Sequence, residues 1–272
     1  MRITVPPGAC DTHMHFYDRR YPASETAWLF PPDFLLPDYR AMQARTGLSR
    51  MIVVQPVTYG FDNRCILDNV AAIGDAARAV VTVRPDITDE ALADLWARGA
   101  RGLRYHQMKG SMTEWADVPR MAERIAGSGW HLQIQFDGME FPDHAGMLAA
   151  LPCTIVIDHM GRYSQAVTPD HPAVTPLLDL ARQDNVWVKL SGAYHVSRSG
   201  GPDYADVAPI ARALVAQGTG RLLWGSDWPH PTEAPEHMPD DALLLDLLAD
   251  WTDSQDQVDA ILSHNPARLY GY

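Results

Sequence analysis

The chain has 272 residues and a formal net charge of −12 at pH 7, from 22 lysine or arginine and 34 aspartate or glutamate side chains. This acidic balance argues against nucleic acid and against an anionic membrane surface as partners, because both are bound through basic patches. An anionic substrate would therefore need a local group of cations. The sequence has neither a signal-peptide-like apolar core near residues 1–8 nor an apolar run of membrane-spanning length, so we expect a cytoplasmic protein.

A chain of this length can bury one large hydrophobic core, and no Ser/Gly-rich or charged linker divides it. We therefore expect a single domain over residues 1–272. The three cysteines, Cys10, Cys65 and Cys153, are widely spaced and odd in number. They indicate neither a disulfide framework nor a cysteine-based zinc site. No oligomeric state follows from the composition.

Short apolar runs rich in β-branched residues recur along the chain. They predict eight strands, at residues 9–15, 50–55, 79–84, 100–106, 130–136, 153–159, 186–191 and 221–227. Windows with apolar residues three or four apart lie between most of them and predict helices at residues 66–78, 89–98, 117–127, 174–183 and 204–217. Repeated βα units require a parallel sheet. Eight of them in a chain of this size predict an α/β fold of the (β/α)8 TIM-barrel type, ahead of an open doubly wound sheet.

Polar or ionisable residues lie at or near the C-terminal ends of several predicted strands. They are His13 and His15 on the first strand, Arg104 and His106 on the fourth, Gln133 and Gln135 on the fifth, His159 on the sixth and Asp227 on the eighth. Residues two apart on a strand share a face, so His13 and His15 point the same way. A barrel places its first and last strands side by side, with its active groups at the strands' C-terminal ends. We therefore expect His13, His15 and Asp227 to share one site.

Six motifs occur in order along the chain. They are Asp11-Thr-His-Met-His15, Arg101-Gly-Leu-Arg104, Asp158-His-Met-Gly-Arg162, Val188-Lys-Leu-Ser-Gly192, Gly225-Ser-Asp-Trp-Pro-His230 and Asn265-Pro-Ala-Arg-Leu-Tyr-Gly271. With these motifs the chain resembles the amidohydrolase superfamily, in the branch of lactonases typified by 2-pyrone-4,6-dicarboxylate lactonase. The resemblance implies a single (β/α)8 domain whose reaction centre is lined by four residues: His13, His15, His159 and Asp227. The chain departs from the pattern at Ala193-Tyr194-His195, where we expect an arginine for a substrate carboxylate. Either Arg198 takes its place or the substrate lacks that carboxylate.

Lactone hydrolysis needs a base for the attacking water, a partner for the carbonyl oxygen and a proton for the departing ring oxygen. Asp227 suits both proton steps, and the histidines suit polarisation of the carbonyl. We therefore expect a hydrolase that opens the ester bond of a small anionic, carboxylated lactone. The alternatives are a zinc-dependent decarboxylase of an aromatic or muconate-type acid, and a sugar-acid lactone isomerase. A barrel that only binds is disfavoured, because convergent ionisable groups are costly to desolvate.

The same residues decide what is expected of metals and of substrate binding. No metal is favoured; if one is present, it is a single zinc ion at His13, His15, His159 and Asp227. A second ion is disfavoured, because glutamines on the fifth strand are poor transition-metal ligands. The expected substrate-binding residues are Arg104, Arg162, Gln135, Tyr59 and His195, with Lys109 as a weaker candidate. His131, at the start of the fifth strand, is expected at the surface.

Overall fold

The computed structural model describes residues 1–272, apart from the side chain of Pro235. Eight strands form one sheet in sequence order, and every neighbouring pair from the first to the eighth is parallel. The strands are β1 Cys10–Met14, β2 Arg50–Val54, β3 Ala77–Val81, β4 Ala100–His106, β5 His131–Gln135, β6 Thr154–Ile157, β7 Val186–Ser191 and β8 Leu222–Gly225. The eight predicted strands are therefore all present.

The sheet curls so that β8 returns to β1. An isolated parallel bridge joins Met14, the last residue of β1, to Trp228, which follows β8. The backbone N–H of Asp227 donates to the carbonyl oxygen of His13 at 2.7 Å, and that of His15 donates to Trp228 at 2.8 Å. The approach is close, because a Cβ on Gly225 would lie 2.6 Å from the Cβ of His13. The prediction of a (β/α)8 barrel is thus confirmed.

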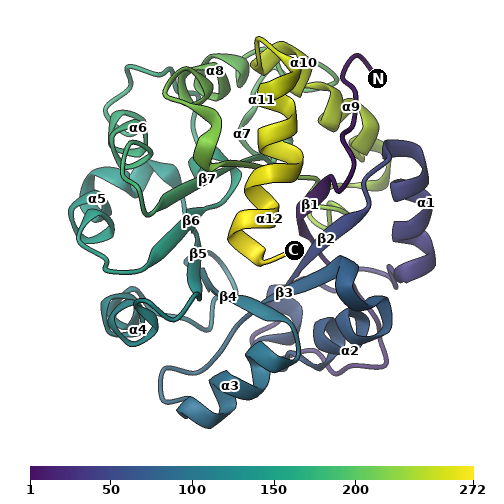
Figure 1. Cartoon of the computed structure of the whole chain (residues 1–272), viewed down its shortest axis with the longest axis vertical. Helices are drawn as coiled ribbons and strands as arrows, with labels where there is room; N and C mark the ends of the chain where they lie inside the picture. The colour runs from purple at the N-terminus through teal and green to yellow at the C-terminus, as the bar shows by residue number, and fades with distance from the viewer.

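Helices surround the strands as a ring, as Figure 1 shows. They are α1 Leu36–Thr46, α2 Arg64–Ile73, α3 Asp89–Ala97, α4 Val118–Ile125, α5 Phe141–Ala149, α6 Thr175–Leu180, α7 Ala193–Val196, α8 Ala208–Ala216, α9 Asp241–Asp246, α10 Leu248–Trp251, α11 Gln255–Asp259 and α12 Asn265–Tyr270. Among the described residues, no helix combines the length and the apolar character needed to cross a membrane.

Several element boundaries differ from the sequence-based expectation. β3 begins at Ala77, so the helix predicted over 66–78 ends at Ile73. β6 ends at Ile157 and β8 at Gly225, so His159 and Asp227 lie in the loops that follow these strands. Both residues have a left-handed backbone, with φ of 52° and 62°. Extended strands cannot contain such residues, which is why the two strands end before them.

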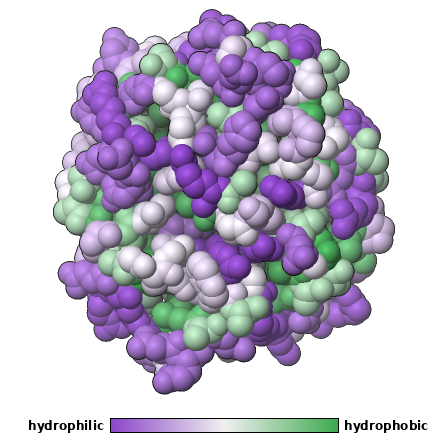
Figure 2. All heavy atoms as spheres, viewed as in Figure 1, coloured by the Kyte–Doolittle hydropathy of each residue, from purple (hydrophilic) through white to green (hydrophobic). Residues whose placement is uncertain are grey.

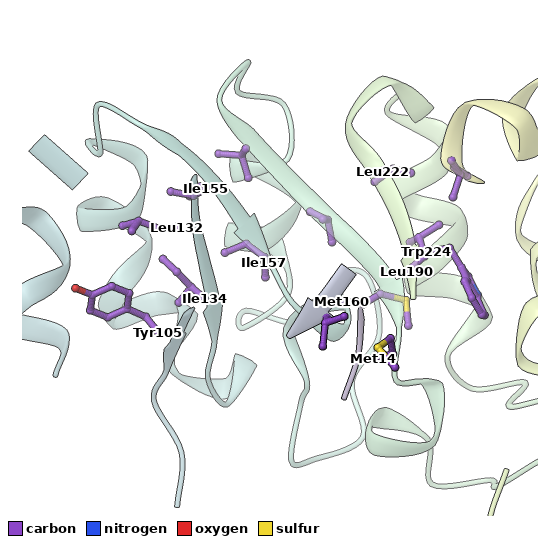
Figure 3. Packing of buried hydrophobic residues seen from close by; sticks show 14 of the residues in the cluster. Met14, Tyr105, Leu132, Ile134, Ile155, Ile157, Met160, Leu190, Leu222 and Trp224 are labelled. Atoms are coloured by element: carbon purple, nitrogen blue, oxygen red, sulfur yellow. The ribbon is translucent and has the colours of Figure 1, made fainter. Parts of the chain in front are cut away.

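The hydrophobic core lies mainly between the strands and the helices. Alternate strand residues such as Ile134, Ile157 and Leu190 are buried on this outer side, as Figure 3 shows. A smaller apolar cluster, which includes Val54, Val156 and Leu223, occupies the opposite face of the strands, in the barrel lumen. The lumen therefore has an apolar lower part, and its polar residues gather towards the C-terminal ends of the strands.

The C-terminal helix α12 covers the other end of the barrel, which faces the viewer in Figure 1. Asn265 begins this helix, and its side-chain amide donates to the carbonyl oxygens of Thr219 and Leu222. Tyr270 at the helix end is fully buried and belongs to the lumen cluster. On this face, hydrophilic residues cover most of the surface and hydrophobic ones form scattered groups (Figure 2). The substrate site is therefore expected at the opposite, open end.

Candidate active site

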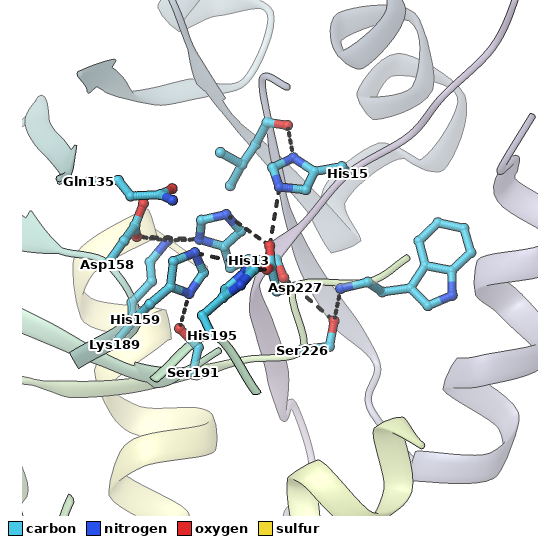
Figure 4. Close-up of polar contacts among 12 residues, drawn as sticks. His13, His15, Gln135, Asp158, His159, Lys189, Ser191, His195, Ser226 and Asp227 are labelled. Carbon is cyan, nitrogen blue, oxygen red and sulfur yellow. Dashed lines mark hydrogen bonds and ion pairs between the residues drawn. The ribbon is translucent and has the colours of Figure 1, made fainter. Parts of the chain in front are cut away.

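Asp227 lies at the centre of a group of histidines at the C-terminal end of the barrel (Figure 4). The Nε2 atoms of His13, in β1, and of His15, just after it, lie 3.5 Å and 3.3 Å from its Oδ1 atom. The Nε2 atom of His159, which follows β6, lies 4.0 Å from Oδ2. All four side chains are almost completely buried. The closure of β8 against β1 thus brings together the four residues that the sequence singled out.

Two residues of the short helix α7 hold the other side of this carboxylate. The Tyr194 hydroxyl donates to Asp227 Oδ2 at 2.5 Å, and His195 Nε2 lies 3.0 Å from the same atom. Burial alone would raise the pKa of Asp227, but the neighbouring His159, His15 and His195 hold it well below its usual value of 3.8. Asp227 is therefore ionised at neutral pH and can accept a proton.

The hydrogen bonds of His15 and His159 orient both rings. His15 Nδ1 lies 2.8 Å from the carbonyl oxygen of Val54, which can only accept, so this nitrogen carries a proton. The Nε2 atom of His15 faces Asp227 Oδ1. His159 Nδ1 is 2.9 Å from the Ser191 hydroxyl, and burial lowers the pKa of His159 well below 6.5. Neutral His159 can therefore present Nε2 to a substrate.

His13 lies below the other two histidines, and a buried lysine lies behind it. Its Nδ1 atom is 3.2 Å from Lys189 Nζ and 3.3 Å from Asp158 Oδ1. Burial lowers the pKa of His13 to about 3, so the ring is neutral at pH 7. Lys189 and Asp158 are themselves 3.3 Å apart and fully buried. Burial would raise the pKa of Asp158, but Lys189 and His13 hold it well below its usual value.

A pocket of about 200 Å³ opens directly above Asp227. Its polar walls come from His15, Arg104, His106, Lys109, Gln135, His159, Arg162, His195, Asp227 and Thr232, and its less polar walls from Tyr17, Trp28, Leu29, Pro56, Val57, Met108 and Pro231. The Arg104 guanidinium donates to Gln55 O at 2.6 Å and to Gln135 Oε1 at 2.7 Å. Its Nε–H is buried and has no hydrogen-bond partner among the described residues. The pocket thus combines a carboxylate base with a cation whose N–H donors are only partly paired.

Most of the expected site residues line this pocket. Of the expected substrate-binding residues, Arg104, Arg162, Gln135 and His195 do so, and so does Lys109. Tyr59 does not: its hydroxyl contacts the backbone N–H and carbonyl of Asp18, and the residue borders a neighbouring pocket. Arg198, considered for the missing arginine, donates instead to the carbonyl of Ser164, and it is absent from the residues that border the pocket.

Three features of the site differ from the sequence-based reading. His13 is completely buried and contacts Asp227 rather than the pocket. His131 is buried in the lumen, so its expected surface position was wrong. Lys189 was given no role, although Trp187, Lys189 and Ser191 alternate on β7 and must share the lumen face. That alternation was the available signal.

Nitrogen and carboxylate atoms converge here as they do in metal sites. His13, His15 and Asp227 form one of three groups whose donor atoms lie within 4.8 Å of one another. His13 Nε2 is buried and makes no hydrogen bond to the described residues. A nitrogen that ligates a metal ion is likewise not used in a hydrogen bond. The positions of these residues therefore suit a single ion. A second ion has weaker support, because β4 presents Arg104 and β5 presents glutamines at the corresponding level.

Comparison with known proteins points in the same direction. The family model described as amidohydrolase matches residues 10–272. A 2-pyrone-4,6-dicarboxylate hydrolase of Comamonas testosteroni is 34% identical over 99% of this chain and 92% of its own length. A 4-sulfomuconolactone hydrolase of Hydrogenophaga intermedia is 35% identical over 100% and 91%. A D-galactarolactone isomerase of Agrobacterium fabrum is 34% identical over 97% and 91%. All three relatives act on lactones.

Proposed function

The chain belongs to the amidohydrolase family, and on this basis we propose that it opens the ester bond of a small anionic lactone by hydrolysis. The observation that carries the proposal is the position of Asp227. Its carboxylate lies at the base of a pocket whose wall also holds His159 and Arg104. A base, a donor for the carbonyl oxygen and a cation for an anionic substituent are thus within reach of one small molecule.

Asp227 acts as the base in the proposed reaction. It takes a proton from the water that attacks the lactone carbonyl, and it later returns a proton to the departing ring oxygen. While protonated at Oδ1, it can donate to the Nε2 lone pair of His15, 3.3 Å away. His159 donates from Nε2 to the carbonyl oxygen as this oxygen becomes anionic. A metal ion held by His13, His15 and Asp227 would supply Lewis-acid polarisation of the same carbonyl.

Arg104 binds the anionic substituent of the substrate. A guanidinium that already donates to Gln55 and Gln135 is fixed in direction, and its free Nε–H is costly to leave buried without an acceptor. Arg162 and Lys109 also border the pocket and add positive charge. The ring of the lactone then lies against apolar walls such as Trp28 and Met108. A cationic pocket of this kind is what an anionic substrate requires in a protein of net charge −12.

Isomerisation between lactone ring sizes is the second candidate, because one of the three relatives is a D-galactarolactone isomerase. The same carbonyl activation serves an internal hydroxyl as well as water. A zinc-dependent decarboxylase uses similar residues, but its reaction would release CO₂ and require the ion. The three reactions differ in their products, so analysis of the products can separate them.

The test is a panel of pyrone dicarboxylate, sulfomuconolactone, aldonolactones and aldarolactones, followed with a pH indicator in the presence and absence of a chelator. Hydrolysis releases a proton for each ester opened, whereas isomerisation releases none and is detected by NMR of the products. We expect proton release with at least one anionic lactone and little with its neutral analogue. Turnover of neutral lactones alone, or CO₂ release that depends on zinc, would contradict the proposal.

A further inference from the structure

Lys189 is a buried cation that the proposed mechanism does not use. It lies on β7 in the barrel lumen, with an exposed fraction of 0%. Its Nζ atom is 2.9 Å from Thr12 O, 2.7 Å from Gln133 Oε1, 3.2 Å from His13 Nδ1 and 3.3 Å from Asp158 Oδ1. Burial of a charge costs several kcal/mol unless it is well paired, so its position directly behind His13 calls for an explanation.

The hydrogen-bond geometry divides the three N–H groups of Lys189 among these neighbours. Thr12 and Gln133 take two of them through oxygen atoms that can only accept. The third is directed at His13 Nδ1, while the contact with Asp158 Oδ1 is an ion pair without hydrogen-bond geometry. Asp158 Oδ2 in turn accepts from the Gln133 amide at 3.0 Å. With Nδ1 as an acceptor, the single proton of neutral His13 is on Nε2.

We propose that Lys189 is a positioning residue that holds His13 with its proton on Nε2, so that His13 turns an N–H, and not a lone pair able to ligate a divalent cation, towards Asp227. Ligation by His13 would need a free lone pair on Nε2 and hence a proton on Nδ1. Asp158 Oδ1, 3.3 Å from Nδ1, is placed to accept that proton, as carboxylates do behind metal-bound histidines. Lys189 competes for the same nitrogen and thereby selects the metal-free arrangement.

The proposal rests on the proposed function only in taking Asp227, beside His13, as the centre of the reaction. It therefore makes a claim about zinc affinity that does not depend on finding the substrate. A variant without the ammonium leaves Nδ1 free to donate to Asp158, and Nε2 becomes available as a ligand beside His15 and Asp227. Loss of Lys189 is thus expected to create a tighter metal site.

The first experiment measures Zn²⁺ binding by competition with a chromophoric chelator. We expect Lys189→Met to bind one Zn²⁺ roughly 10–100-fold more tightly than the wild type, the range typical of changes behind a metal ligand. His13→Ala in the Lys189→Met background should remove the gain. The matched control is Lys109→Met, which removes the same charge from the pocket rim without touching His13. Equal gains in both lysine variants, or no gain in Lys189→Met, would overturn the proposal.

The second experiment uses the unaltered protein, so it remains decisive if Lys189→Met does not fold. NMR of protein with ¹⁵N-labelled histidine distinguishes a protonated from an unprotonated ring nitrogen, and a His13→Gln sample identifies the His13 signals. We expect the His13 proton on Nε2 in the absence of metal. A proton on Nδ1 would show that Asp158, not Lys189, determines which ring nitrogen of His13 is protonated. The proposal would then be wrong even if lactone hydrolysis were established.

Discussion

Two histidines in the barrel lumen, His13 and His131, have pKa values lowered to about 3, and burial is the main cause for both. Their surroundings differ in charge and in hydrogen bonding. His13 lies within 3.5 Å of Asp227, Asp158 and Lys189. Neither ring nitrogen of His131 has a hydrogen-bond partner among the described residues, and its ring packs against that of Tyr270 at 5.3 Å. A strongly shifted pKa by itself therefore indicates burial. The reaction centre is indicated only where such a group also lies close to other charged groups.

The largest effect is expected from Asp227→Asn, at the reaction centre that His13 helps to form. Asparagine keeps the shape of the side chain but cannot take a proton from water, so kcat/KM should fall about 10²–10⁴-fold on the best lactone. Thermal unfolding followed by circular dichroism should change little, because an amide can still accept from Tyr194. Near-normal turnover of this variant would mean that another group activates the water.

Arg104→Met tests whether the pocket recognises an anion. Methionine keeps part of the apolar stem but removes the buried donor, so we expect kcat/KM for anionic lactones to fall roughly 10–100-fold, the equivalent of one charged hydrogen bond. Arg198→Met serves as the control, because Arg198 does not line the pocket and donates to the backbone of residue 164. Equal losses in the two variants would point to overall charge as the cause.

Much of the fold could be read from the sequence, because most strands are short apolar runs, several of them rich in β-branched residues, and most of the helices between them are amphipathic. Of the helices that were not predicted, α1 has a weakly patterned apolar face, whereas α5 is as amphipathic as α3 and was overlooked. The exact ends of β6 and β8 depend on left-handed residues, which no local pattern reveals. These ends matter, because they place His159 and Asp227 in loops.

The site was predicted less completely than the fold. The HxH pair, His159 and Asp227 were identifiable because they follow strands, but the distance between them depends on closure of the ring. His131 and Gln133 alternate along β5, so the lumen position of His131 was available from the pattern and was overlooked. The contact of the Tyr59 hydroxyl with the Asp18 backbone, in contrast, depends on the path of a long loop. The path of that loop depends on tertiary packing, so no local sequence pattern predicts it.

In the lower lumen, Gly102→Ala should reduce stability and leave catalysis unchanged. A Cβ at this position would lie 2.2 Å from His131 Nε2, so the ring or the strand must move. We expect the free energy of unfolding to fall by about 1–3 kcal/mol, as for other overpacked cores. Urea denaturation measures this, and adding His131→Ala should restore part of the loss. A drop in kcat/KM at full folding would show that the two regions are coupled.

The smallest effect is expected from His131→Leu at pH 7, where the ring is neutral and replaceable by an apolar group. The folded-state pKa of His131 is about 3 against 6.5 in an unfolded chain, so unfolding takes up a proton between these pH values. Stability is then complete above pH 6.5 and is lost as the pH falls, by roughly 1.4 kcal/mol per pH unit for this group. Leucine should remove this part of the decline in the free energy of unfolding, as measured by urea denaturation at several pH values. An unchanged slope would assign the acid sensitivity to other groups.

The seam between β1 and β8 joins residue 13 to residue 227 through a backbone hydrogen bond. On the ribosome, at about 5–20 residues per second, roughly ten to forty seconds separate the synthesis of these two residues. Throughout that interval the nascent chain contains His13 and His15 but not yet their carboxylate partner. The reaction centre can therefore form only late in synthesis. A chain cut short before its eighth strand has the histidines but no base.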